Sequence, residues 1–416
     1  MKTHIGTGER ENKFFQSAIV TADFFDMLLS LSDQKCYNDL KSKHSVLRRR
    51  FRMKRILSIA LLLVVTAALI FAGGQQETKK VQKTKVAFIY VGPHNDGGWS
   101  QAHDNGRLYL EKNVPNVETA YSENVPEGAP AEKVIRDYAN QGYKVIFATS
   151  FGFMDPMLNV AKDYPNVVFE HCSGYKTYKN MGTYFGRMYQ PDYLAGLVAG
   201  FMTKTNYIGF VAPFSIPEVV REIDAFTIGV REVNPKAEVH VIWTNSWFDP
   251  VKEANAANTF LANNADIIAS GVDSPAPLQA AEKKGKYGIG YDSDMSSFAP
   301  KAVLTSRIWH WGIYYAKTVK EVQAGTWKPT QYWGGMKDGI VSLAPFGPMV
   351  PDKVKEYVNK RQQQILDGTY DPFMGPIYDQ KGVLRVKKGE ELSDADKLSL
   401  QWFVRGVVGS IPKSGS

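Results

Sequence analysis

Short apolar runs alternate with amphipathic segments from Lys85 onward, and this alternation is the strongest pattern in the chain. Runs such as KVAFIYV (85–91) and KVIFATS (144–150) are rich in β-branched and aromatic residues, which is typical of strands buried on both faces. The segments between them, such as 98–112 and 130–143, carry apolar residues at helical spacing. Repeated β-α units of this kind predict parallel sheets that are covered by helices on both faces.

The same pattern restarts after an Ala/Gly-rich helical segment at 189–203. The simplest interpretation is two doubly wound α/β units of similar size. We expect a first lobe made of 84–200 with 301–328, and a second lobe made of 205–298 with 329–416. A cleft between two such lobes is the natural place for a ligand.

An uncharged apolar stretch precedes this body of the chain. Residues 56–72 contain no charged side chain, a cluster of Arg and Lys stands before them, and a Gly-Gly pair follows. A basic region, an apolar core and a small-residue exit predict a secretory signal peptide at 53–72, cleaved after Ala72. An uncleaved membrane anchor is the alternative, because the stretch is at the short limit for a span. We expect residues 1–52 to lie upstream of the true start and outside the functional fold.

The chain has only two cysteines, Cys36 and Cys172. This excludes a framework of several disulfides and a zinc site built from cysteines. Neither cysteine stands at the expected cleavage point, where a lipoprotein would need one to carry its acyl chains. The sequence therefore predicts a soluble exported product, retained in the periplasm of a Gram-negative-type envelope.

The basic charge lies mostly outside the body of the chain. The sequence has 50 Lys and Arg against 42 Asp and Glu, and residues 1–72 hold 12 against 6 of these. The remaining residues therefore hold 38 against 36. Since this body has almost no net positive charge, it is not expected to bind nucleic acid.

Aromatic rings and carboxylates follow the ends of the predicted strands, where open α/β sheets bind ligands. The rings are Trp99, Phe151, Phe153, Trp247 and Phe248, and the carboxylates are Asp96, Asp155, Asp273, Asp292 and Asp294. Rings that stack on its faces and carboxylates that accept its N–H groups suit a planar heteroaromatic ligand. Any single ring fits core packing equally well, and an acid such as Asp155, which precedes a proline, fits a helix cap.

Catalytic and metal-binding readings have less support. The chain lacks the phosphate-loop, zinc-protease, nucleophile-elbow and dinucleotide-binding motifs. His171 and Cys172 are neighbours on a predicted strand and point to opposite faces, so they cannot act as base and nucleophile. His94 and His103 could join Asp96 around a metal, but a helix-surface or polar-contact role fits them better, since no third His lies close in sequence. We therefore predict no catalytic residue, metal or cofactor, and keep a nucleoside-processing enzyme as the alternative from another class.

Several motifs, in this order and spacing, resemble the basic-membrane-protein family, the purine-nucleoside-receptor type of ABC-transporter substrate-binding protein. They are KVAFIYVGPHNDGGWSQAHDNGR, TSFGFMDP, FEHCSGYKT, YQPDYLAGLVAG, NSWFDPVKEANAA and YDSDM. The resemblance runs from about Lys85 to at least Gly347. It implies a type I periplasmic-binding-protein fold, in which two Rossmann-like doubly wound lobes are joined by a three-crossover hinge. It also implies no catalysis, a small-molecule ligand, ABC permease subunits as partners and a monomeric chain.

The resemblance also implies which residues hold the ligand. By position in the motifs, they are Asn95, Asp96 and Trp99 in the first loop, Ser150 and Phe151 in the T-S-F-G loop, Trp247 in the second lobe, and Asp292. The strand-end position of Asp273 and Asp294 makes them further candidates. Trp309, in the segment 305–311, and Lys337, in the segment 330–345, complete the set.

One departure from the family pattern bears on the ligand. Nucleoside-binding relatives commonly continue a Thr-Ser pair with two residues and then a lysine that helps to hold the ribose. Here the segment is TSRIWHW (305–311), and no lysine is present. The departure therefore predicts a free purine base, adenine or a relative, rather than a nucleoside. A purine nucleoside, a sugar or an autoinducer remains an alternative ligand, and a membrane-receptor sensor remains an alternative role for the same fold.

Overall fold

The computed structural model describes residues 83–412, together with Met53, Arg55, residues 57–63 and Thr66. Residues 81–416 cluster as one compact unit. The upstream segment and half of the expected signal peptide lie outside the described residues. Among the residues that are described, no helix has the length and apolar character needed to cross a membrane.

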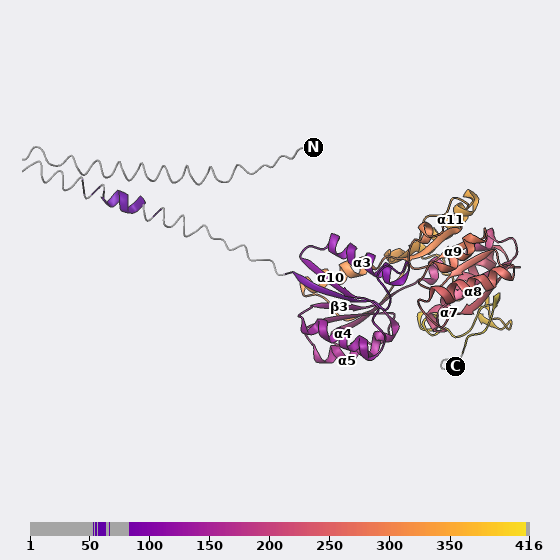
Figure 1. Cartoon of the computed structure of the whole chain (residues 1–416), viewed down its shortest axis with the longest axis horizontal. Helices are drawn as coiled ribbons and strands as arrows, with labels where there is room; N and C mark the ends of the chain where they lie inside the picture. The colour runs from indigo at the N-terminus through magenta and orange to yellow at the C-terminus, as the bar shows by residue number, and fades with distance from the viewer. Residues whose placement is uncertain (1–52, 54, 56, 64–65, 67–82, 413–416) are drawn as a thin grey trace, which may run out of the picture. The chain divides into compact units, whose positions relative to one another are not determined.

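The first lobe is built on a parallel sheet with the strand order β2-β1-β3-β4-β5-β11. Its strands are β1 (Thr84–Ile89), β2 (Val117–Ser122), β3 (Val145–Ala148), β4 (Val168–Cys172), β5 (Met181–Gly186) and β11 (Gln331–Gly334). Both faces are covered, as the buried residues of β1 and β3 require. Figure 1 shows helices on both sides of β3. They are α4 (Ala129–Asn140) and α5 (Met154–Asp163) on one side, and α3 (Trp99–Asn113) and α10 (Trp311–Ala324) on the other.

The second lobe repeats this plan. Its sheet has the order β12-β10-β9-β8-β6-β7-β15, parallel except where β12 pairs with β10. The strands are β6 (Tyr207–Ala212), β7 (Glu238–Trp243), β8 (Ile267–Ser270), β9 (Tyr287–Gly290), β10 (Val303–Trp309), β12 (Val341–Leu343) and β15 (Val407–Val408). The covering helices are α6 (Tyr189–Met202), α7 (Pro217–Val233), α8 (Pro250–Ala262) and α9 (Ala276–Lys283), and α11 (Asp352–Leu366) packs against α6.

The chain crosses between the lobes three times. It passes from β5 to α6, from β10 to α10, and from β11 to β12. Five strands of each sheet follow the doubly wound order 2-1-3-4-5 when they are numbered within their lobe. The predicted fold class, two doubly wound lobes joined by three crossovers, is therefore confirmed.

The expected lobe boundaries differ from the structure at these crossovers. Helix α6, expected in the first lobe, packs on α7 and β10 of the second. The segment 301–328 is divided, because β10 pairs with β9 of the second sheet whereas α10 packs on α3 of the first. Strand β11, expected in the second lobe, pairs with β5. Hydrophobic periodicity indicates that a segment is a buried strand, but it does not say to which of two similar sheets the strand belongs.

A C-terminal extension follows α11 and packs on the second lobe. It contains a short ribbon of β13 (Ile377–Tyr378) and β14 (Leu384–Val386), helix α12 (Asp394–Leu398), and β15, which extends the sheet beside β7. Arg187, in the first crossover, forms a two-pronged ion pair with Asp394 of α12, at 2.7 and 2.6 Å. Its guanidinium also lies over the Trp333 ring, 4.1 Å from the centroid. The extension is thus fastened directly to the hinge.

Candidate functional site

The carboxyl ends of the strands of both lobes meet at a narrow cleft. Its walls surround about 360 Å³ of space that contains no atoms, part of it open to solvent. The first lobe contributes Val91, Trp99, Ser150, Phe151 and Ser173, and the second lobe contributes Glu218, Trp247, Asp273 and Tyr291. Five of the residues expected from the sequence are therefore brought together here. They are Trp99, Ser150, Phe151, Trp247 and Asp273.

Trp99 is held in a fixed orientation on the first-lobe side. Its indole N–H donates to the carbonyl of Thr149 at 2.5 Å. Its ring meets the rings of His103, Trp309 and Trp311 edge to face, with centroids 4.5, 5.8 and 5.6 Å away. A ring braced in this way presents a flat apolar surface at little further cost in side-chain entropy on binding.

Two further rings line the cleft, one from each lobe. Phe151 begins the short helix η2 (Phe151–Phe153) and is 37% exposed. Trp247 is half-buried and packs edge to face on Phe214, with centroids 5.1 Å apart. Since rings from both lobes line one cleft, a flat guest between them would be stacked when the lobes close.

Two carboxyl groups of the second lobe face the cleft without hydrogen-bond partners. Asp273 is 3% exposed, and its Oδ2 atom has no partner among the described residues. Burial raises its pKa well above the usual range, and the charges of Asp292 and Asp96 add to this effect. Burial likewise raises the pKa of Glu218 to about 7, against the lowering effect of Arg221. No lysine or arginine lines the cleft itself, and the effect of Arg221 on Glu218 is outweighed by burial.

Glu218 was not expected from the sequence. It follows Pro217 in the first turn of α7, where an acidic residue is ordinarily a helix-terminus feature. Its position just beyond the end of β6 was the available signal, because the same reasoning selected the loops after the neighbouring strands.

In the loop between β1 and α3, the Asp96 side chain binds the backbone of its own segment. The Asp96 carboxylate accepts hydrogen bonds from the backbone N–H groups of Gly98, Ser100 and Gln101 at 2.8, 2.8 and 3.0 Å. Asp96 is buried and does not line the cleft, so it shapes the start of α3. Asn95 is exposed and lies outside the lining.

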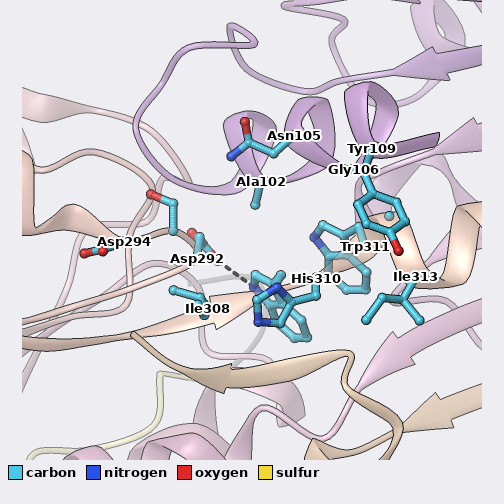
Figure 2. Close-up of a pocket in the computed structure, with 13 residues that line it drawn as sticks. Ala102, Asn105, Gly106, Tyr109, Asp292, Asp294, Ile308, His310, Trp311 and Ile313 are labelled. Carbon is cyan, nitrogen blue, oxygen red and sulfur yellow. Dashed lines mark hydrogen bonds between the residues drawn. The ribbon is translucent and has the colours of Figure 1, made fainter. Parts of the chain in front are cut away.

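Three other expected residues line a second hollow, beside the β10–α10 crossover (Figure 2). This hollow has about 790 Å³ of space, part of it open to solvent, and includes Asp292, Asp294 and Trp309. The Trp309 indole N–H donates to Asp292 Oδ1 at 2.8 Å, shown as the dashed line. Trp309 also stacks on Trp311, with centroids 4.4 Å apart. Trp309, which lines this hollow, thus packs against Trp99, which lines the cleft.

Asp294 and Lys337 both lie away from the cleft. Asp294 is exposed and caps the short helix η3 (Met295–Ser297) by accepting from Ser296 N–H at 3.0 Å. Lys337 is exposed in η4 (Met336–Asp338) and lines neither hollow. Across the part of the chain that the structure describes, no group of three His, Cys, Asp or Glu residues is placed to hold a metal ion.

The lobes touch each other at the edge of the cleft. The Ser293 hydroxyl, from the second lobe, donates to the carbonyl of Gly97 at 2.5 Å. Gly98 lies so close to Asp273 that a Cβ atom there would stand 2.1 Å from the Asp273 carbonyl oxygen. The structure therefore has the lobes in a closed arrangement, and the cleft is correspondingly narrow.

Comparisons with known proteins show which proteins the chain is similar to. The chain is 43% identical to a purine-binding protein of Brucella abortus (strain 2308) over 353 residues, which cover 85% of this chain and all of that protein. It is 40% identical to a putative ABC transporter glucose-binding protein of Haloferax volcanii, covering 82% of this chain and 83% of that one. A solved ABC-transporter solute-binding protein from Conexibacter woesei shares the fold, with a TM-score of 0.58 and 22% identity over 69% of this chain and 98% of that one.

The sequence profile of one family covers most of the folded unit. It matches residues 83–370 and is described as "ABC transporter substrate-binding protein PnrA-like", the Bmp family. Substrate-binding proteins of this kind bind a solute outside the cytoplasm and pass it to a transporter, without catalysis. The chain therefore belongs to the PnrA-like family of ABC-transporter substrate-binding proteins.

Proposed function

We propose that this substrate-binding protein captures a free purine base of the adenine type in its cleft and delivers it to ABC permease subunits. The main support for this proposal is the lining of the cleft, which combines aromatic rings from both lobes with two carboxyl groups that have no partner among the described residues. Stacking on the faces of a base and hydrogen bonds to its edge are the contacts that such a lining offers. The 43% identity to a purine-binding protein supports the same class of ligand.

The absence of a cation from the lining favours the base over the nucleoside. Trp309 occupies the position where the family resemblance leads us to expect a ribose-holding lysine, and its N–H is bonded to Asp292. Arg307, two positions earlier, is fully buried in the second lobe, where it pairs with Asp192 and donates to the Gly290 carbonyl at 3.2 Å. Neither side chain is free to bind ribose hydroxyls.

The affinity that such a site must supply is physically reasonable. A micromolar to nanomolar Kd corresponds to about −8 to −12 kcal/mol. A purine base has roughly ten heavy atoms, so each must contribute about 0.8–1.2 kcal/mol, which is below the ceiling of ~1.5 for very small ligands. The required binding free energy per atom is close to this ceiling, so lobe closure must bury nearly the whole base.

A sugar is the second candidate ligand, because one relative at 40% identity is named as a putative glucose-binding protein. Pyranose rings also stack on tryptophan, and carboxylates accept hydrogen bonds from hydroxyl groups. A sugar offers no aromatic face, however, so it would use the two-sided arrangement of rings less fully than a purine does.

Titration calorimetry of the ligand-free protein with adenine, adenosine and glucose tests the proposal. We expect saturable binding of adenine, weaker binding of adenosine and no binding of glucose. Clearly tighter binding of adenosine would reject the free-base assignment. Binding of glucose without binding of either purine would reject the purine class altogether. Mass spectrometry of any small molecule that copurifies with the protein provides an independent check.

A further inference from the structure

Glu218 is a carboxyl group for which the protein itself provides no hydrogen-bond or ion-pair partner among the described residues. It lines the cleft from the N-terminal turn of α7. Glu218 is partly buried in this position. A carboxyl withdrawn from water without a partner is costly to maintain, and a partner that arrives with the ligand explains it.

The charged and titratable groups around Glu218 are mostly acidic. Arg221 and Glu222 lie on the same helix. Asp273 and Asp292 lie in the loops that follow β8 and β9, and burial, helped by the charge of Glu218, raises the pKa values of Glu222, Asp273 and Asp292. Cys172, at the end of β4, and Tyr291, after β9, are its other titratable neighbours. Arg221 is the only cation of this set, and its guanidinium donates to the Lys397 carbonyl at 2.9 Å. Burial disfavours a negative charge on Glu218, and it outweighs the opposite effect of Arg221.

We propose that Glu218 determines which purine is bound, and that it acts as a neutral carboxylic acid, donating its proton to a ring nitrogen and accepting a hydrogen bond from an adjacent N–H. This inference rests on the proposed function and specifies how the base is recognised. A neutral carboxyl offers one donor and one acceptor side by side, whereas a carboxylate offers acceptors only. The pKa of Glu218, raised to about 7, makes the neutral form available at physiological pH.

Adenine and guanine differ in the hydrogen-bond donors and acceptors that their edges present to Glu218. Adenine presents an N–H donor beside a ring-nitrogen acceptor on each of its hydrogen-bonding edges, which matches a neutral acid. Guanine presents two adjacent N–H donors on its pairing edge, which matches a carboxylate. We therefore expect adenine to bind more tightly than guanine at and below neutral pH, and the preference to narrow as the pH rises and Glu218 loses its proton.

The direction of the pH effect follows from proton linkage. If only the neutral form of Glu218 binds adenine, affinity is constant below the pKa of the free protein and falls above it, by up to about tenfold per pH unit. Adenine itself keeps its charge across this window, so the effect belongs to the protein. Binding should also be accompanied by proton uptake above neutral pH, which calorimetry in buffers of different ionisation enthalpy detects.

The experiment measures adenine and guanine affinity between about pH 6 and about pH 8 for the wild type, Glu218→Gln, Glu218→Ala and Asp273→Asn. Glutamine mimics the neutral acid, so Glu218→Gln should still bind adenine but without the pH slope and without proton uptake. Glu218→Ala should lose more than tenfold in adenine affinity, and Asp273→Asn should keep the slope. Circular dichroism verifies that each variant is folded.

The outcomes separate this inference from the function on which it rests. A flat pH profile in the wild type, or a slope that survives in Glu218→Gln, overturns the role of Glu218 while leaving purine binding intact. A slope that disappears only in Asp273→Asn assigns the proton to Asp273 and overturns the inference as well. Failure of the wild type to bind any purine at any pH instead rejects the proposed function.

Discussion

Trp309 is the residue that bears most directly on whether the protein binds a free base or a nucleoside. It is 5% exposed, it stacks on Trp311, and its N–H occupies one oxygen of Asp292. The other oxygen, Oδ2, has no partner among the residues described. A smaller cationic side chain at this position would release the Asp292 carboxyl and open space beside it for a ribose.

We expect Trp309→Lys to raise the ratio of adenosine to adenine affinity by more than tenfold, as measured by calorimetry. Lysine restores a donor for ribose hydroxyls, while the loss of the indole weakens the support of Trp99 and thus adenine binding. Ile313→Lys is the matched control, because Ile313 is 40% exposed and lines the second hollow away from the cleft. An unchanged ratio in Trp309→Lys would show that this position does not exclude the sugar.

The cleft rings give a second prediction at the residue scale. Trp247→Ala and Phe151→Ala should each weaken adenine binding by more than tenfold, because stacking contributes about 1–3 kcal/mol per base. Both side chains are partly exposed, so the melting temperature of the ligand-free protein should change little. Tyr175→Ala, at a residue that is 63% exposed and outside the lining, serves as control. If both cleft variants bind adenine normally, the stacking assignment is wrong.

At the scale of elements, β4 carries two buried titratable groups on opposite faces. Glu170 accepts hydrogen bonds from Tyr314 at 2.9 Å and from Trp327 at 2.8 Å. Burial raises the pKa of Glu170 to about 7. His171 donates from Nε2 to the Ser150 carbonyl at 2.8 Å, and burial lowers its pKa to about 4. Because the folded strand favours the neutral form of both, their contributions to stability change with pH in opposite directions.

The histidine therefore predicts loss of stability in acid. Its pKa is lower in the folded chain than the unfolded value of 6.5, so its contribution is complete above about pH 6.5 and is lost as the pH falls toward about 4. The effect on the free energy of unfolding is at most about 3 kcal/mol. His171→Gln keeps an N–H donor but cannot be protonated, so the difference in unfolding free energy between wild type and variant should shrink across this window. A pH-independent difference in urea-unfolding experiments would contradict the assignment.

The strands also show which parts of the fold hydrophobic patterns can predict. Apolar runs with β-branched residues predicted the central strands correctly, because burial on both faces demands such runs. Strand β5, with the sequence MGTYFG, was not predicted, since its glycines and polar residues conceal the pattern. The short hinge strands β11 and β12 were not predicted either, because strands of a few residues carry little periodicity.

The same limit applies to the site. Strand ends predicted which loops reach the cleft, but the direction of each side chain depends on local backbone. Asp292 has φ of 64°, a left-handed conformation that turns the chain directly after β9 and directs its carboxyl to Trp309. Asp96 accepts hydrogen bonds from three backbone N–H groups that only the folded loop brings together. Sequence spacing contains neither piece of information.

For the whole molecule, function depends on closing two lobes around a very small guest. The hinge is stiffened from one side, where Arg187 connects the first crossover to α12 of the C-terminal extension and to Trp333 beside the third crossover. At the edge of the cleft, the contacts of Gly97 with Ser293 and of Gly98 with Asp273 form only when the lobes meet. When the lobes close, the backbone at Gly98 therefore meets the backbone of Asp273, whose carboxyl group lines the cleft.

This arrangement makes Gly98 a test of closure. In Gly98→Ala, the new Cβ would stand 2.1 Å from the Asp273 carbonyl oxygen, and neither atom can move by a simple side-chain rotation. The lobes would have to stop short of the closed arrangement, and a base of roughly ten heavy atoms depends on nearly complete burial for its affinity. We expect adenine affinity to fall more than tenfold, while the ligand-free protein melts as the wild type does.

Ser293→Ala is the graded control for this prediction, because it removes one hydrogen bond at the same contact without adding bulk. It should weaken binding only a few-fold, in line with the ~1 kcal/mol of a typical hydrogen bond. Small-angle scattering with saturating adenine should show compaction for the wild type and Ser293→Ala but not for Gly98→Ala. If Gly98→Ala binds and compacts like the wild type, closure does not need this contact. A lower melting temperature without ligand would instead show that the glycine serves the packing of its own loop.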